Sequence, residues 1–171
     1  GRWDDGSVKW LMAHFLADLP GNRGHRMGFV WDGSAEASGP EPGVRVTETC
    51  EGVEIDTGPL QVVCAREGFN LFRQVKLNGE EIFGPGGFSG FYLVDEEGRR
   101  FETGKASVES VEVVDEGPVR AVVEFAGVHV GEGGTLFDFR VVVVAWAGKP
   151  WVDVEYQFIN RERRGDVTLS E

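Results

Sequence analysis

The sequence has few of the residue types that most catalytic and metal centres use. Its 171 residues include two cysteines, three histidines and two tyrosines. The histidines are far apart, and none has a spacing typical of metal ligands, such as H-x-x-x-H. We interpret His14, His25 and His129 as ordinary surface or hydrogen-bonded core histidines. The sequence also lacks a nucleophile elbow, a phosphate-binding loop and a dinucleotide fingerprint, which argues against serine-hydrolase, kinase, nucleotidyl-transfer and hydride-transfer activities.

Positive charge and long apolar segments are scarce as well. Lysine and arginine number 17 against 29 aspartates and glutamates, which gives a formal net charge of -12. Such a field repels nucleic-acid backbones and anionic membrane surfaces, so we expect neither as a partner. No segment approaches the roughly 20 apolar residues that a membrane-spanning helix requires. The charge is compatible with neutral sugars, and with acidic ligands held by a local arginine cluster or a bound cation.

Glycine, by contrast, is abundant, and its 25 residues mostly separate short apolar segments. This pattern is typical of strands joined by tight turns. The clearest hairpin is predicted over residues 71–83, because Asn78-Gly79 favours the turn that matches strand twist. Long antiparallel strands with one polar and one apolar face predict an all-β fold, an antiparallel β-sandwich. Its other strands are predicted over residues 44–47, 53–55, 60–65, 91–94, 99–102, 108–114, 119–130, 136–146 and 151–160.

The first part of the chain has a different pattern. Residues 7–32 predict a partial β-hairpin or barrel segment that precedes the sandwich, and residues 32–43 are rich in glycine and proline, as a linker is. The first residue is not methionine, and the last residues read as the start of a new strand. We therefore interpret the chain as a fragment or processed form of a longer protein, with a domain boundary near residue 42.

Several segments resemble one family of sugar enzymes. The string Trp3-Asp4-Asp5-Gly6-Ser7-Val8-Lys9-Trp10-Leu11 is similar to one in the N-terminal barrel-like β-domain of the exo-rhamnogalacturonan lyase and YetA-like family. Residues 117–121, 140–144 and 147–150 resemble the β-sandwich that follows. By this resemblance, residues 1–42 are the tail of the N-terminal β-domain plus a linker. Residues 43–171 are then the central β-sandwich domain, incomplete at its C-terminus.

The resemblance implies a role beside a catalytic domain. Family members continue into a helical toroid that carries most of the catalytic cleft, and this chain has no long helical segment. We therefore expect the non-catalytic β-portion of a polysaccharide lyase, a carbon–oxygen lyase, acting on rhamnogalacturonan-type pectin. The chain would brace the catalytic domain and contact substrate, and be inactive by itself. The alternative is a stand-alone carbohydrate-binding or structural β-sandwich module without enzymatic activity.

The expected partners follow from the same resemblance. They are a polysaccharide or oligosaccharide and a covalently continuous helical catalytic domain. No catalytic residue can be carried over, because the matching motifs are structural. We expect no cofactor and no metal ligands in this chain, while a calcium ion in the longer protein remains open. The compartment is also open, with an extracellular or periplasmic location favoured over a cytoplasmic one.

Five side chains are candidates for substrate contact. Trp31 and Trp151 offer indole faces that can stack on a pyranose ring. Lys9 lies in the first motif, on the strand face opposite its apolar neighbours. Arg161 and Arg163 belong to the densest basic cluster and suit a uronate carboxylate through forked hydrogen bonds. Each also has a structural explanation, packing for the tryptophans and solvation for the charged residues.

The two cysteines form one further candidate feature. If Asp56 to Gly58 is a tight turn, Cys50 and Cys64 lie almost opposite each other on adjacent strands. They would then be a disulfide or two neighbouring buried thiols.

Overall fold

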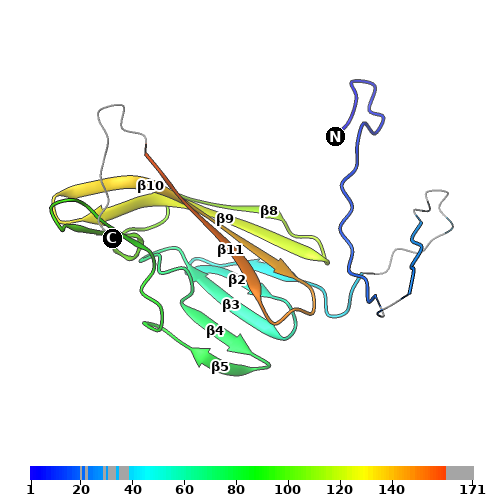
Figure 1. Ribbon diagram of the computed structural model, residues 1–171, viewed down its shortest axis with the longest axis horizontal. Coiled ribbons are helices and arrows are strands. Elements are labelled where there is room, and N and C mark those ends of the chain that lie inside the picture. Colours follow the sequence, from blue (N-terminus) through cyan, green and yellow to red (C-terminus); the bar gives the residue numbers. More distant parts are fainter. Residues whose placement is uncertain (20, 22, 29, 31–33, 35–38, 161–171) are drawn as a thin grey trace.

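The computed structural model shows two antiparallel sheets packed face to face (Figure 1). It describes residues 1–19, 21, 23–28, 30, 34 and 39–160. Sheet I has the order β1-β2-β3-β4-β5, with β1 (Arg45–Glu48), β2 (Gly52–Asp56), β3 (Leu60–Ala65), β4 (Gln74–Leu77) and β5 (Glu80–Phe83). Sheet II has the order β11-β10-β9-β7-β6, and β8 also pairs with β9. Its strands are β6 (Tyr92–Val94), β7 (Arg100–Glu102), β8 (Ser110–Asp115), β9 (Arg120–Gly131), β10 (Gly134–Trp146) and β11 (Val152–Ile159).

All strand pairs are antiparallel, so the predicted all-β sandwich is confirmed. The predicted hairpin is β4–β5, where Asn78 and Gly79 have φ values of 52° and 84°. These positive values are those of the primed turn that Asn-Gly favours. The only helical element among the described residues is a 3-10 turn, η1 (Thr103–Lys105). Within that part of the chain, no helix is long and apolar enough to cross a membrane.

The core lies between the two sheets and follows the two-residue period of the strands. In β10, Phe139, Val141, Val143 and Ala145 are buried and face sheet I. Sheet I contributes apolar side chains of β2 and β3 to the same cluster. The alternate residues of β10 point to the other side of sheet II, because successive side chains of a strand face opposite sides. The apolar second half of β10 therefore has one buried face and one that is partly exposed.

One buried hydroxyl ties the two sheets together at an end of the sandwich. Thr57, in the turn between β2 and β3, donates a hydrogen bond from Oγ1 to the carbonyl of Lys149, at 2.7 Å. The carbonyl of Thr57 accepts from the amide of Gly148 at 2.7 Å. Both partners belong to the turn between β10 and β11. These bonds fix one end of sheet I against one end of sheet II.

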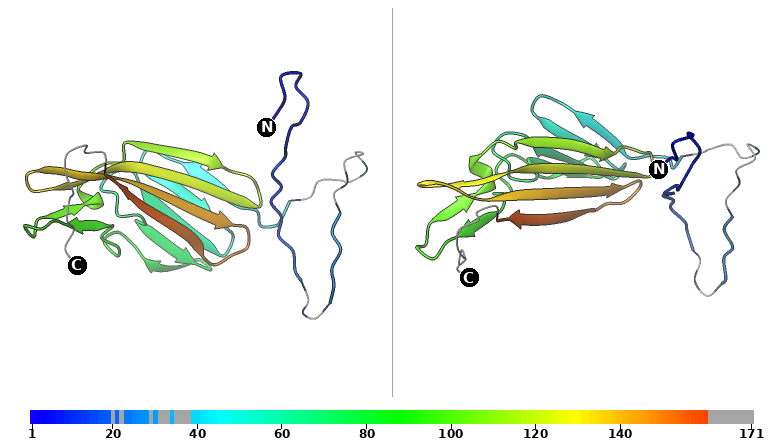
Figure 2. Two further views of the ribbon diagram at one scale, coloured as in Figure 1. Left: turned by 45° about the horizontal axis from the view of Figure 1, so that its top comes forward. Right: turned by 90° about the horizontal axis from the view of Figure 1, so that it is seen from above.

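The described part of the first forty residues does not form the predicted hairpin. Their described part contains one isolated bridge, Arg2 with Val8, and otherwise runs as extended chain beyond one end of the sandwich (Figures 1 and 2). Leu11 is 83% exposed, and Met12 and Phe15 are exposed as well. A two-stranded hairpin is marginal in water unless its apolar face is covered. These side chains stay largely exposed in the described structure, so the alternating pattern of apolar residues is not sufficient to form strands here.

Candidate functional site

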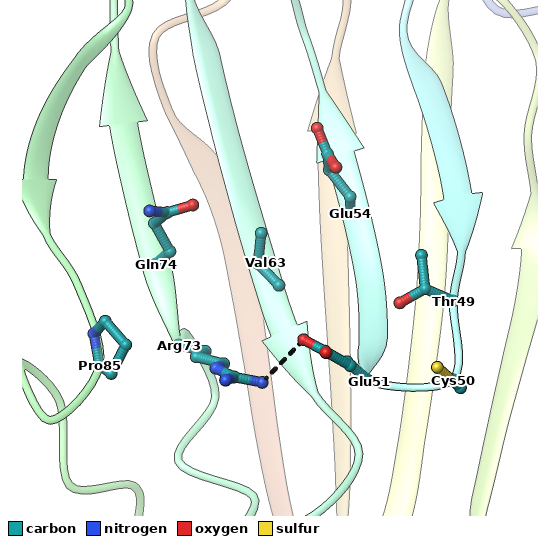
Figure 3. Close-up of a pocket in the computed structure, with 8 residues that line it drawn as sticks. All are labelled: Thr49, Cys50, Glu51, Glu54, Val63, Arg73, Gln74 and Pro85. Atoms are coloured by element: carbon teal, nitrogen blue, oxygen red, sulfur yellow. Dashed lines mark hydrogen bonds and ion pairs between the residues drawn. The ribbon is translucent and has the colours of Figure 1, made fainter.

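A shallow groove of about 530 Å³ lies on the outer face of sheet I (Figure 3). We call it the sheet I groove. Its lining comes from three strands and from the loops at their ends. The lining residues are Thr49, Cys50, Glu51, Glu54, Val63, Arg73, Gln74 and Pro85.

The floor of the groove is a row of side chains across three strands. Glu54 of β2 is opposite Val63 of β3, and Val63 is opposite Gln74 of β4. The residues before and after Glu54, Val53 and Ile55, are buried in the core, so the row faces outward. Two strand spacings separate Glu54 from Gln74, which places their backbones roughly 10 Å apart. A short apolar side chain thus lies between two polar ones.

One end of the groove is closed by an ion pair. Nη1 of Arg73 lies 3.2 Å from Oε2 of Glu51, which belongs to the turn between β1 and β2 (Figure 3). The two side chains are 43% and 71% exposed, so the pair contributes little to stability, about 0–1 kcal/mol. Only one of the five N–H donors of the guanidinium makes this contact. The remaining donors are available to a ligand in the groove.

The other polar groups of the groove are mostly acceptors. Nε2 of Gln74 donates to Oε2 of Glu81 at 2.5 Å, and the amide oxygen of Gln74 points toward Val63 (Figure 3). Within the described residues, Glu54 is exposed and has no ion-pair partner. The lining therefore holds two carboxylates, Glu51 and Glu54, against one guanidinium. The electrostatic potential of the groove is negative overall.

Of the substrate-contact candidates from the sequence, the two that the structure describes, Lys9 and Trp151, do not line this groove. Nζ of Lys9 lies 4.4 Å from the ring centroid of Trp3, a cation–π contact within the N-terminal segment. Trp151 is 46% exposed, next to the start of β11 in sheet II. Trp31, Arg161 and Arg163 lie outside the described residues, so their roles stay predictions. Two-residue alternation could have indicated the outward direction of Glu54, Val63 and Gln74, but only the strand register shows that they are neighbours.

The predicted pairing of the cysteines is wrong. The turn after Asp56 does form, but the register of β2 and β3 sets Val53 opposite Cys64. Cys50 lies three residues earlier, in the turn before β2. Both thiols are free; Cys50 is exposed and Cys64 is buried. Burial raises the pKa of the Cys64 thiol to about 12, so this thiol is protonated and unreactive at neutral pH.

A second surface lies on the outer side of sheet II. It is formed by Glu124 of β9 with Arg140, Val142, Val144 and Trp146 of β10, and we call it the sheet II outer face. Arg140 donates from Nε and Nη2 to the two carboxylate oxygens of Glu124, both at 2.6 Å. This forked hydrogen bond holds the pKa of Glu124 below its usual range. The valines and the tryptophan are partly exposed, and the exposed Asp153 and Glu155 of β11 lie opposite Val144 and Val142, so the face is an apolar strip flanked by charged side chains.

The titratable pair in the interior of the sandwich is structural. Nδ1 of the buried His129 lies 2.9 Å from the carbonyl oxygen of Phe137, which can only accept, so Nδ1 carries the proton. Nε2 then accepts from the hydroxyl of Tyr156 at 2.5 Å. Desolvation lowers the pKa of His129, and burial raises the pKa of Tyr156 to about 12. Both groups are neutral at pH 7. The interpretation of His129 as a hydrogen-bonded core histidine is confirmed.

We predict that this pair makes the fold sensitive to mild acid. Because the pKa of His129 is lower in the folded chain than its unfolded value of 6.5, the unfolded chain binds a proton first as the pH falls. The free energy of unfolding should decrease below about pH 6.5, by at most about 1.4 kcal/mol per pH unit. Urea unfolding at several pH values between 7 and 5 measures this decrease in the free energy of unfolding. The dependence of the free energy of unfolding on pH should disappear in the variant His129→Gln. An equal dependence in the natural chain and the variant would contradict the assignment of this effect to His129.

The structure assembles no metal centre in the part it describes. Among those residues, no group of three or more histidines, cysteines, aspartates or glutamates is placed to hold a metal ion. Asp5, in the first sequence motif, accepts instead from the amide and hydroxyl of Ser7, at 2.9 and 2.6 Å. This local hydrogen-bonding pattern is an Asx turn.

Comparison with known proteins defines the class of this domain. Residues 44–168 match the family model described as "PcRGLX-like protein central beta sandwich domain", and the chain belongs to that family. The resemblance to the exo-rhamnogalacturonan lyase and YetA-like family is thereby confirmed. The chain is also 26% identical over 133 residues to the uncharacterized protein YetA of Bacillus subtilis (strain 168). The match covers 75% of this chain and 15% of YetA.

Proposed function

We propose that this domain is the non-catalytic β-sandwich part of a polysaccharide lyase that acts on rhamnogalacturonan-type pectin. It braces the catalytic domain and contacts the saccharide. The observation that carries the proposal is membership of the central β-sandwich family over residues 44–168. The match to a small share of YetA supports it, because most of that longer relative lies outside the matched segment.

The sheet II outer face supports the bracing role. Val142, Val144 and Trp146 present a partly exposed apolar strip along β10, which lies between β9 and β11. The forked Arg140–Glu124 pair beside them holds two charges in fixed positions. Interfaces between domains of one chain are typically of this mixed polar and apolar kind. A second domain seated here would cover the strip and keep the ion pair at its centre.

The saccharide contact is tested by calorimetry on the purified chain. We titrate it with rhamnogalacturonan and, in parallel, with polygalacturonate. The proposal predicts measurable binding heat with rhamnogalacturonan and weaker binding to polygalacturonate, because the chain is strongly acidic and polygalacturonate carries a carboxylate on every sugar. Absence of heat with rhamnogalacturonan would contradict the saccharide contact and leave only the bracing role.

A further inference from the structure

The sheet I groove has the arrangement of groups that a sugar ring requires. Protein sites for small ligands combine an apolar contact surface with a few polar groups that fix orientation. Val63 supplies the apolar surface at the centre of the groove. Glu54 and Gln74 flank it on neighbouring strands, roughly 10 Å apart across the sheet. A single pyranose ring and its hydroxyl groups fit between them.

The hydrogen-bonding capacity of the groove also suits hydroxyl groups. The Glu54 carboxylate is an acceptor without an ion-pair partner among the described residues, and the amide oxygen of Gln74 points toward Val63 (Figure 3). Arg73 supplies the donors, because only one of its N–H groups contacts Glu51. A sugar hydroxyl both donates and accepts, so it can use either kind of group. Acceptors on both sides and a donor at one end match a ring that carries several hydroxyls.

The charge of the groove decides which sugar it takes. Glu51 and Glu54 together outweigh Arg73, and Glu81 adds a further carboxylate beside Gln74. A uronate carboxylate would have to approach these groups in a chain whose net charge is -12. Arg73 would attract it, but Glu51 already lies 3.2 Å from that guanidinium. Repulsion therefore exceeds attraction for an acidic sugar, and an uncharged sugar does not meet this penalty.

We infer that the sheet I groove is a subsite for one uncharged sugar, a hexose or deoxyhexose unit. This inference rests on the proposed function and deepens it, because it assigns the saccharide contact to named residues. The C–H face of the ring lies on Val63, Glu54 and Gln74 accept from its hydroxyls, and Arg73 donates to it. The groove is shallow, so the affinity for a free monosaccharide is about millimolar.

The test is a chemical-shift titration of the ¹⁵N-labelled chain with L-rhamnose, D-galactose and D-galacturonate. A neutral sugar should shift the backbone amides of Glu54, Val63 and Gln74, whereas galacturonate at the same concentration should shift them far less. Glu54→Ala should weaken neutral-sugar binding about tenfold, since it removes a charge-assisted hydrogen bond. Glu112→Ala is the matched control, because Glu112 is an exposed strand residue of sheet II, and it should leave the affinity unchanged.

A charge-reversal variant tests the specificity separately. Glu51→Gln combined with Glu54→Gln leaves Arg73 as the one charged residue of the groove lining. Galacturonate should then bind about tenfold more tightly than it binds the natural chain. The spectrum of each variant also shows whether the chain is folded, so loss of binding and loss of structure are distinguished.

The outcomes separate this inference from the proposed function. Neutral-sugar shifts in the groove that weaken in Glu54→Ala support the inference. Galacturonate shifts at the groove equal to those of rhamnose would overturn it. Shifts from a rhamnogalacturonan oligosaccharide confined to sheet II would also overturn it, while the saccharide contact of the proposed function would stand. If that oligosaccharide shifts no amide at all, both the inference and the saccharide contact fail.

Discussion

Replacing Phe139 with alanine is expected to lower the free energy of unfolding by about 3–5 kcal/mol. The side chain is 1% exposed and lies at the centre of an aromatic cluster. Its ring stacks on Phe69 with centroids 5.3 Å apart and meets the ring of His129 edge-on at 5.5 Å. The loss is large because the cluster is held by β9 and β10 of sheet II and by the loop between β3 and β4, and it cannot collapse around the cavity. A domain of this kind is stabilised by about 5–15 kcal/mol in total, so much of its stability depends on this residue.

Chemical denaturation monitored by tryptophan fluorescence measures this loss. Phe139→Leu is the matched control, because it keeps most of the apolar volume and should cost less than about 1.5 kcal/mol. If Phe139→Ala costs less than 1 kcal/mol, the ring is not the centre of the core. If Phe139→Ala and Phe139→Leu lower the free energy of unfolding by the same amount, this would also contradict the central position of the ring in the core.

Replacing Gly52 with alanine should be similarly severe, with a loss of about 3 kcal/mol. A Cβ atom at this position would lie 2.1 Å from the carbonyl oxygen of Cys64 on the neighbouring strand. That oxygen belongs to the backbone of β3, so the clash cannot be relieved by turning a side chain. We expect the end of the β2–β3 ladder to open. Because Gly52 also bonds to Thr49 at the rim of the sheet I groove, the groove should lose its closed end.

Gly24→Ala is the matched control for Gly52→Ala. No atom lies within 4 Å of a Cβ built at Gly24, so this change should alter stability by less than about 0.5 kcal/mol. Thermal unfolding of both variants, followed by circular dichroism, measures the difference. Equal melting temperatures for the two variants would show that β2 and β3 are not in the register described here.

The strands of the sandwich could be predicted because their signals are local. Asn78-Gly79 specifies a turn by its own backbone preferences, and the structure forms the β4–β5 hairpin around it. The alternation along residues 151–160 likewise predicts the polar face of β11, where Asp153, Glu155 and Gln157 are exposed. Both patterns involve only residues that are close together in the sequence. They predict the structure correctly where a second sheet covers the apolar face of the strand.

Features that depend on partners distant in the sequence could not be predicted in this way. The alternation at Val8, Trp10 and Met12 predicted a strand, but in the described structure these side chains are exposed and no strand forms. A tight turn over residues 56–58 would place Cys50 opposite Cys64, but the turn in the structure is longer, and Val53 lies opposite Cys64. In the structure Thr57 donates its amide to the carbonyl of Leu60, and pairing resumes at Gln61. A change of this size in turn length shifts every pair along the strands.

The candidate site shows the same limit. The groove residues Glu54, Val63 and Gln74 are ordinary strand residues when each is taken alone, and only the register of β2, β3 and β4 makes them one row. The sequence analysis favours Trp, Lys and Arg side chains instead, because their chemical type suits a sugar or a carboxylate. Of these, Trp151 is exposed beside β11, and Lys9 contacts Trp3 in its own segment. Residue type alone does not show which polar groups share a surface.

The central claim is that this domain holds the saccharide without cleaving it. The most direct test records the ultraviolet absorbance of the unsaturated product on the same solution in which calorimetry has shown rhamnogalacturonan to be bound. We predict saturable binding heat and no increase in absorbance over the incubation. An increase in absorbance that is proportional to the concentration of the chain would contradict the account, because it would place the lyase chemistry within these 171 residues.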